Sequence, residues 1–206
     1  VDPDPTPPAP EPKPILPILP SGGQSAWKNP YQDVTDSSSY YEAVCYVTEK
    51  GLMNGTSAST FSPDAAMTRA MMVTILWRME KEPAALRSNF TDLTADWYRT
   101  AVDWAAETGV VNGVGNGKFA PNATLSLEQL ITILYRYAEN KGYNVSKSAS
   151  LDSFTDGSAV SAYARPAMQW AVGMNFLSGN TLTPGAPASR AQIAQVLMLF
   201  CKAYIK

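Results

Sequence analysis

The chain has 206 residues, and its 16 Lys and Arg nearly balance its 18 Asp and Glu. It contains no histidine, which excludes Ser-His-Asp and Cys-His catalysis and a zinc site built on histidine. The near-neutral charge argues against sequence-independent binding to nucleic acid through a broad basic field.

The first 28 residues are rich in proline, and nine of the 16 prolines lie in the first 20 positions. Each proline fixes φ and removes a backbone donor, so this stretch can form neither a helix nor a central strand. We predict a semi-rigid spacer over residues 1–28, and a docking ligand for an aromatic groove is the alternative. Because the chain begins at Val1 without a Met, we expect a processed product or a piece of a longer protein.

Residues 29–206 contain three copies of one unit, over 29–86, 87–149 and 150–206. Each copy opens with an aromatic residue two positions before an aspartate, and then continues into a run whose apolar residues recur at spacings of three and four. That spacing predicts a helix with one apolar face. The expected last residues of these helices accept the left-handed conformation: Gly51, Gly109 and Asn175. An aromatic residue expected in the core precedes a glycine by nine positions: Tyr46 and Gly55, Trp104 and Gly113, Trp170 and Gly179.

A second helix is predicted in each copy after the motif F-S-P, F-A-P or L-T-P. A hydroxyl residue follows the proline by five positions and is a natural N-cap. In the second and third copies, a glutamine three residues later completes a capping box. The hydroxyl residues are Thr68, Ser126 and Ser189, and the glutamines are Gln129 and Gln192.

Arginine occupies the first position of the second helix in two copies, at Arg69 and Arg190. The helix macrodipole disfavours a cation there, so stability alone does not favour this choice. If a carboxylate binds at this place, free N–H groups, the positive helix end and the guanidinium converge on it. The alternative is a solvated surface arginine.

In this order, the motifs resemble the S-layer homology (SLH) repeat, whose consensus runs F-x-D-V, W-Y-x-x-A-I, G-I-(I/V)-x-G, F-x-P and I-T-R-A-E. Three tandem copies are usual in that family, and here they cover residues 29–206, nearly everything except the proline-rich linker. The resemblance implies an all-α fold in which three helix-loop-helix repeats close into a pseudo-threefold spindle. It also implies clefts between neighbouring repeats.

The resemblance further implies a non-catalytic cell-wall anchoring module that binds secondary cell-wall polysaccharide, commonly bearing pyruvate ketals. Such a module acts outside the cell, at the cell wall or S-layer of a Gram-positive-type bacterium. Other S-layer subunits and a cargo joined upstream of the linker are further expected partners. No cofactor, metal or nucleic acid is expected, and no apolar run is long enough to insert into a membrane.

In the family, the arginine of T-R-A-E, the aspartate of F-x-D-V and nearby glycine backbone and aromatic groups hold the anionic sugar. The corresponding glycan-binding candidates, together with one loop lysine, are Arg69, Arg190, Asp33, Asp92, Asp156, Trp97, Gly55, Gly113 and Lys118. Each aspartate could instead be a turn or cap residue that bonds its own backbone. Tyr98, next to Trp97, is a second aromatic residue that could stack on a pyranose ring.

The copies depart from the family pattern in ways that predict unequal clefts. None keeps the final glutamate of T-R-A-E, and the second copy has Leu127 where the arginine is expected. Its cleft has therefore lost the main cation, unless Lys118 replaces it. We predict that the cleft containing Arg69 binds best and that the one containing Leu127 binds least.

Two other classes of function stay open. The triplet could be a structural S-layer or lattice assembly module with little glycan affinity. An enzyme is less favoured, because nothing in the sequence fixes the separation of Asp92 and Asp96 as an acid and base for glycoside hydrolysis. Asp96 also adjoins a predicted helix start, where a negative charge is ordinary.

Cys45 and Cys201 lie 156 positions apart and match no metal-ligand spacing. A disulfide between them and a pair of buried thiols both stay open. Cys45 aligns with Asp103 and Gln169 of the other copies, which predicts an exposed side chain.

Overall fold

The computed structural model describes residues 27–205, so the predicted spacer lies outside the described residues except for its last two. Within 27–205 the chain forms six α-helices, one 3-10 turn and no strand, which confirms the all-α prediction with two helices per copy. The elements are α1 (Tyr41–Glu49), α2 (Arg69–Met79), α3 (Asp96–Glu107), α4 (Leu127–Asn140), η1 (Gly157–Ala159), α5 (Arg165–Gly173) and α6 (Arg190–Tyr204). No helix in this range is long and apolar enough to cross a membrane.

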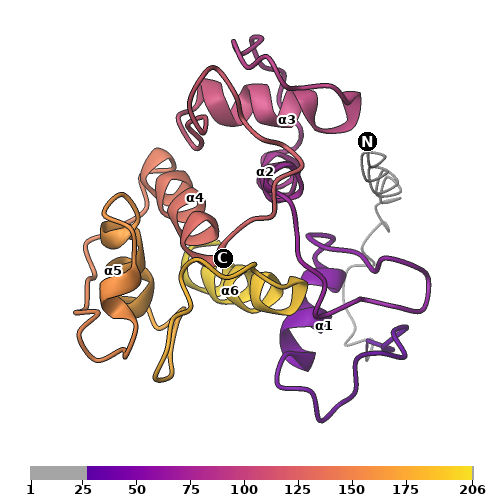
Figure 1. The fold of residues 1–206 in the computed structure, drawn as a ribbon. Helices are drawn as coiled ribbons and strands as arrows, with labels where there is room; N and C mark the ends of the chain where they lie inside the picture. Colours follow the sequence, from indigo (N-terminus) through magenta and orange to yellow (C-terminus); the bar gives the residue numbers. More distant parts are fainter. Residues whose placement is uncertain (1–26, 206) are drawn as a thin grey trace, which may run out of the picture.

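The helices pack in pairs that join different repeats. The second helix of one repeat packs against the first helix of the next, which pairs α2 with α3 and α4 with α5. The third pair is α6 with α1, so the last repeat contacts the first. Figure 1 shows the three pairs around a common centre, with α2, α4 and α6 toward the inside and α1, α3 and α5 outside.

The structure confirms the predicted N-terminal caps of the second helices and the predicted ends of the first helices. Thr68, Ser126 and Ser189 each accept a hydrogen bond from the backbone N–H three residues later, as N-caps do. The two glutamines complete their capping boxes by accepting from the cap backbone, with Gln192 Oε1 3.0 Å from Ser189 N. The residues that end the first helices have positive φ, at Gly51 (66°), Gly109 (75°) and Asn175 (58°).

Backbone hydrogen bonds join each second helix to the loop of a neighbouring repeat. The first two N–H groups of α2 donate to the repeat 2 loop. Arg69 N donates to Ala123 O and Ala70 N to Pro121 O, each at a distance of 3.0 Å. The N-termini of α4 and α6 repeat this arrangement, and the acceptors include the proline carbonyls Pro184 and Pro63. The proline of each F-x-P motif therefore satisfies a helix N-terminus in another repeat.

Each opening aspartate holds the F-x-P loop of its own repeat. Asp92 accepts from Phe119 N over 2.9 Å and from Ala120 N over 2.7 Å, one bond at each carboxylate oxygen. Asp33 accepts in the same way from Phe61 N and Ser62 N, and Asp156 from Leu182 N and Thr183 N. These contacts favour the alternative that each aspartate bonds backbone N–H groups. The N–H groups lie 26 to 29 residues further along the chain, however, and not in the local turn.

The core contains the apolar stripes of the second helices and most of the aromatic residues expected there. Trp170 is 1% exposed and Trp104 is 7% exposed, which confirms their prediction as core residues. Tyr46 is only half-buried and packs against the core from outside. The buried stripe of the second helices includes Val73, Leu76, Ile131, Leu134, Ala194, Leu197 and Met198.

Both cysteines are free thiols. Cys201 is buried, and Cys45 is half-buried rather than exposed as predicted, because its side chain packs along α1 with Sγ 3.6 Å from Glu49 Oε2. Burial raises the pKa of both thiols to about 11, and the Glu49 carboxylate adds to the shift at Cys45. Neither thiol ionises appreciably near neutral pH.

Two hydrogen bonds join the C-terminal ends of α2 and α4. Glu80 accepts from Tyr137 Oη over 2.5 Å and from Lys141 Nζ over 3.0 Å. Burial alone raises the pKa of Glu80, but these two hydrogen bonds more than offset it, and the pKa lies below its ordinary value of 4.5. The ionised carboxylate therefore ties repeat 1 to repeat 2.

Asp92→Ala is expected to lower the free energy of unfolding by about 2 kcal/mol, because it leaves a buried N–H of the F-x-P loop without its charged acceptor. Urea unfolding at neutral pH measures the change. Asp64→Ala is the matched control, since Asp64 is an exposed loop aspartate, and its effect should stay within about 0.5 kcal/mol. Equal effects of the two substitutions would contradict the structural role of Asp92.

Acid is expected to weaken the domain partly through Glu80. Because its folded pKa is depressed, its contribution is present above the ordinary value of 4.5 and is lost as the pH falls through the folded value. In urea titrations across this range, the free energy of unfolding of Glu80→Gln should fall less steeply than that of the unmodified chain. Glu139→Gln, an exposed control on α4, should keep the original slope; parallel curves for all three chains would refute the assignment.

Candidate functional site

Two buried arginines clamp neighbouring repeats together. Arg69 is 6% exposed, donates from Nε to Phe119 O over 3.0 Å and places its guanidinium 4.8 Å from the centre of the Phe119 ring. Arg190 is 4% exposed and makes the same contacts with Phe61, at 2.8 Å and 4.7 Å. The alternative of a solvated surface arginine is therefore wrong for both, and the arginines do contribute to the contacts between repeats.

The second copy replaces this arginine–phenylalanine pair as a unit. Leu127 stands at the arginine position, and the residue at the phenylalanine position of its partner loop is Leu182. Both leucines are buried, at 5% and 3% exposure, and they line one pocket. An apolar pair thus takes the place of a cation–π pair, which explains why the two departures occur together.

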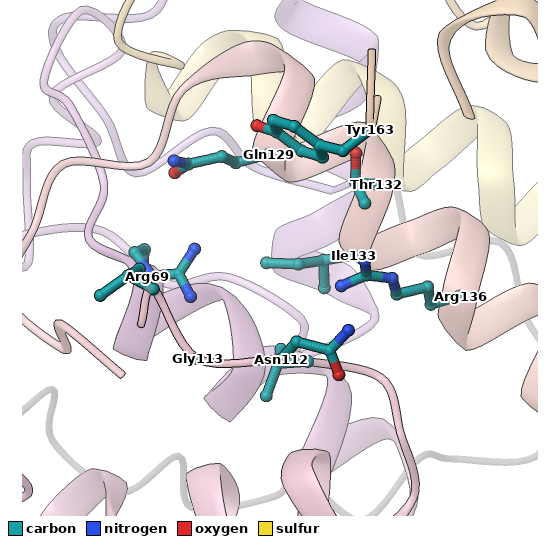
Figure 2. A pocket seen from close by; sticks show the side chains of 10 residues that line it. Arg69, Asn112, Gly113, Gln129, Thr132, Ile133, Arg136 and Tyr163 are labelled. Atoms are coloured by element: carbon teal, nitrogen blue, oxygen red, sulfur yellow. The ribbon is translucent and has the colours of Figure 1, made fainter. Parts of the chain in front are cut away.

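A pocket of about 300 Å³ opens beside Arg69, and we call it the Arg69 pocket. All three repeats line it: Arg69 comes from repeat 1, the segment 111–114 and one face of α4 from repeat 2, and Tyr163 from repeat 3. In Figure 2 the Arg69 and Arg136 guanidiniums point toward each other from opposite sides of the pocket. The neutral polar side chains around them are Asn112, Gln129, Thr132 and Tyr163.

The surroundings of Arg69 penalise its positive charge. Burial lowers the pKa of its guanidinium, and nearby Arg136 acts in the same direction, while Tyr163 and Asp92 oppose the shift. Arginine nevertheless keeps its charge at neutral pH. An anion placed between the two guanidiniums would relieve this penalty and gain charge-assisted hydrogen bonds.

The helix N-terminus contributes less to the pocket than the sequence predicted. The N–H groups of Arg69 and Ala70 donate to carbonyls of the repeat 2 loop, and the N–H of Met71 donates to Thr68 Oγ1. The expectation that free N–H groups converge on a carboxylate is therefore wrong. Anion binding at this place would depend on the guanidiniums.

Tyr163 forms one rim of the Arg69 pocket and is held there by Glu128. Tyr163 Oη donates to Glu128 Oε1 over 3.0 Å, and Ser161 donates to the same carboxylate from both N and Oγ. Burial, with the Glu128 hydrogen bond, raises the pKa of Tyr163 to about 12, so the hydroxyl stays neutral. The side chain is 53% exposed and can present its ring to a ligand.

The other sequence candidates are distributed unevenly around the pockets. Gly113 lines the Arg69 pocket, and a Cβ there would lie 2.5 Å from Lys118 O. A Cβ at Gly55 would lie 2.5 Å from the Tyr31 ring, so loop packing requires both glycines. Trp97 is half-buried, whereas Tyr98 is fully buried and cannot stack on a sugar.

A second pocket, of about 430 Å³, lies beside Leu127, and we call it the Leu127 pocket. It is equivalent to the Arg69 pocket. Leu127 of repeat 2 takes the place of Arg69 of repeat 1, and residues of repeat 3 take the place of those of repeat 2. Leu199 stands there in place of Arg136, and Ser39 in place of Tyr163. Lys118 is exposed and does not line this pocket, so it is not placed to supply the missing cation.

Sequence reasoning missed Arg136, although two signals point to it. Gln129, Thr132, Ile133 and Arg136 follow the spacing i, i+3, i+4 and i+7, which places them on one face of α4. The first copy has Arg78 at the same position of α2. Tyr163 was also missed as a site residue. It lies seven positions before Trp170, just as Trp97 lies seven positions before Trp104, and only this count aligns Tyr163 with Trp97.

A family model described as the S-layer homology domain matches the chain three times, over residues 30–71, 89–131 and 153–194. The three matches together cover more than half of the chain. Each lies within one of the three copies defined by the repeated motifs.

Curated relatives include enzymes and surface proteins. An endoglucanase of Bacillus sp. (strain KSM-635) is 31% identical over 175 residues, which are 82% of this chain and 18% of the relative. A surface-layer 125 kDa protein of Lysinibacillus sphaericus is 30% identical over 162 residues, 75% of this chain and 13% of the relative. A cellulosome-anchoring protein of Acetivibrio thermocellus is 26% identical over 136 residues, 62% of this chain and 30% of the relative. The chain thus spans less than a third of each of these relatives.

Proposed function

The chain belongs to the S-layer homology family, and from this premise we propose that it is a non-catalytic module that anchors a protein to the bacterial cell wall. Its ligand is an anionic, pyruvylated secondary cell-wall polysaccharide, bound between repeats of a pseudo-threefold spindle. The surface-layer and cellulosome-anchoring relatives support a place at the surface of a Gram-positive-type bacterium. The linker and any cargo joined to it lie outside the described residues.

The pair of guanidiniums in the Arg69 pocket is the observation that carries this proposal. A carboxylate between Arg69 and Arg136 would receive charge-assisted hydrogen bonds from both sides. The amides of Asn112 and Gln129 and the hydroxyl of Thr132 can bond the sugar hydroxyls around it. The exposed ring of Tyr163 offers a flat face for the pyranose.

We assign the stronger binding to Arg69 rather than to Arg190. Arg190 donates from Nε to Phe61 O and from Nη2 to Asn54 O, so the repeat 1 backbone holds its guanidinium at two points. Arg69 shares the Nε bond, and its terminal nitrogens face the pocket. At Arg190, the positions of Arg136 and Tyr163 are taken by Arg78 and Trp97, which we propose as a second glycan contact.

The aspartates act indirectly in this proposal. Asp92 holds the Phe119 N–H, and the carbonyl of the same residue accepts from Arg69, so Asp92 positions the arginine through the F-x-P loop. Asp33 and Asp156 hold their loops in the same way. Lys118, which precedes Phe119, adds positive charge beside the pocket.

The enzyme alternative has less support than binding. Both carboxylate oxygens of Asp92 accept backbone N–H groups, which leaves that side chain poorly placed as an acid or base. A lattice module with little glycan affinity is favoured by one observation: among the residues that the structure describes, no cation lines the Leu127 pocket. Concentration-dependent oligomers without retention on cell walls would support that alternative.

The chain should sediment with purified cell-wall sacculi and should lose this retention when the secondary polysaccharide is removed from them. The double variant Arg69→Ala/Arg136→Gln should sediment less than the unmodified chain with intact sacculi, because only the second contact at Arg190 remains. Equal retention of the unmodified chain on intact and stripped sacculi would refute polysaccharide anchoring.

Arg136→Gln is expected to weaken binding of a pyruvylated saccharide by about 1 to 3 kcal/mol, the usual range for a charge-assisted hydrogen bond. Arg69→Ala should lose a similar amount, but it also breaks the clamp on Phe119 and should lower stability. Arg136 makes no hydrogen bond within residues 27–205, so its variant separates binding from folding. Calorimetry should find Arg87→Ala, an exposed control, unchanged; unchanged affinity in Arg136→Gln would argue against the pocket.

A further inference from the structure

The sequence of the proline-rich stretch changes in character at residue 15. Within the first 20 residues, all four charged residues lie in 1–14, whereas 15–20 reads Ile-Leu-Pro-Ile-Leu-Pro and is wholly apolar. A spacer that only separates two parts of a protein in water gains nothing from four large aliphatic side chains, because each exposes apolar surface. We call residues 15–20 the ILP segment, and its composition indicates that it packs against another surface.

The first residue that the structure describes lies beside the Leu127 pocket. The Trp27 ring is 5.8 Å from the Tyr41 ring, in an edge-to-face contact with the start of α1. Tyr41 is followed directly by Glu42 and Ala43, and both of these residues line the Leu127 pocket together with Ser39. The chain therefore enters the domain within one helical turn of this pocket.

Only six residues separate the ILP segment from Trp27. They read Ser-Gly-Gly-Gln-Ser-Ala, a composition typical of a hinge. Six residues of this kind span about 13 Å on average, which is close to the width of one helix. At so short a tether the effective concentration of the segment at the pocket is in the millimolar range, so a weak contact is enough to hold it there.

The lining of the Leu127 pocket matches an apolar segment that contains proline. The apolar residues in this lining include Leu127, Phe176, Leu177 and Leu199. Because proline has no N–H group, the polar backbone groups of such a segment are mainly carbonyls, which require donors. Side-chain amides that can donate are Asn175, Gln192 and Gln195. Gln192 uses its Oε1 atom as the acceptor of the capping box, which leaves its NH₂ group to donate.

Charge favours the Leu127 pocket over the Arg69 pocket as the place for this segment. In the Arg69 pocket, an apolar segment would take water from two guanidiniums and give them no acceptor side chain in return. Among the described residues that line the Leu127 pocket, Glu42 is the only charged one. Its carboxylate is exposed and lies 2.6 Å from Lys202 Nζ, so a neutral segment can bind without burying an unpaired charge.

We propose that the ILP segment docks in the Leu127 pocket of its own chain. Its isoleucine and leucine side chains pack against the leucines and Phe176, and the amides donate to its carbonyls. The contact limits the free spacer to residues 1–14 and fixes the point at which the spacer leaves the domain, at the junction of repeats 3 and 1. This assignment does not depend on the ligand of the Arg69 pocket.

Backbone amide NMR of the full chain tests the contact from the side of the segment. Leu16→Ser/Leu19→Ser removes two of its aliphatic side chains and should shift the amide signals of Ser178, Thr181 and Gln195 by releasing the segment from the pocket. These serine substitutions lie outside the packed helices, so they should leave the fold intact. Unchanged signals at all three pocket positions would overturn the proposal.

The matched control is Val1→Ser/Ala9→Ser, which removes two apolar side chains from the charged part of the stretch. It should leave the signals of the Leu127 pocket unchanged. The amide of Asn112, in the Arg69 pocket, should keep its position in both double variants. Equal shifts of the Leu127 pocket in the control and in the segment variant would contradict a specific contact with the ILP segment.

A substitution in the pocket tests the contact from the other side. Leu199 is half-buried in α6, and Leu199→Lys places a cation where the segment packs. In the unmodified chain, ¹⁵N relaxation of the Leu16 amide should match that of the folded domain, and in Leu199→Lys it should approach that of Asp4. Leu86→Lys, at an exposed leucine, is the control and should leave Leu16 unchanged. Equal relaxation of Leu16 and Asp4 in the unmodified chain would refute docking, whether or not Leu199→Lys folds.

Dilution separates the chain's own segment from that of a second copy. Docking within one chain gives the same signals for the pocket amides at every protein concentration. Signals that move toward those of Leu16→Ser/Leu19→Ser on dilution would assign the contact to a second copy and overturn the proposal.

Discussion

A single carboxylate in each repeat accepts two consecutive N–H groups from a loop 26 to 29 residues further along the chain. At Asp92 these groups belong to Phe119 and to Ala120, which has a φ of 59°. The charged acceptor stabilises a loop whose backbone is otherwise unfavourable. It also turns the Phe119 carbonyl toward Arg69 and presents the ring on which the guanidinium stacks. The pocket therefore depends on a residue that does not line it.

The same loops satisfy the polar backbone at the centre of the domain. The first N–H groups of a helix have no acceptor within the helix, so water, a capping side chain or a ligand normally accepts from them. Here Pro121 and Ala123 of one repeat accept from the helix of another, so three short helix-loop-helix units become one packed body. This arrangement separates two roles that the sequence joins, because the backbone N–H groups of the helix start serve the fold, and in the proposed function only the arginine side chains contact the ligand.

The parts of the fold that were predictable depend on contacts within one copy. The capping residues such as Ser189, the positive φ at Gly109 and the core position of Trp170 all follow from local chemistry and helical periodicity. What could not be predicted depends on contacts between copies. The burial of Arg190 requires a ring and carbonyls more than 120 residues away, and the opposed guanidinium of Arg136 becomes relevant only when α4 lies across from Arg69. Repetition in the sequence shows equivalent positions but not which equivalent positions meet.

The contact of α1 with α6 has a consequence for how the domain is made. In an open solenoid, each repeat meets only its neighbours, so repeats fold progressively and can be gained or lost. Here the first helix packs against the last, and Arg190 bonds a carbonyl 129 positions earlier. Such long-range contacts delay folding until distant segments are present. During synthesis α1 therefore cannot pack in its final place until the last helix has been made. A chain that ends one helix early exposes an apolar face that chaperones and proteases recognise.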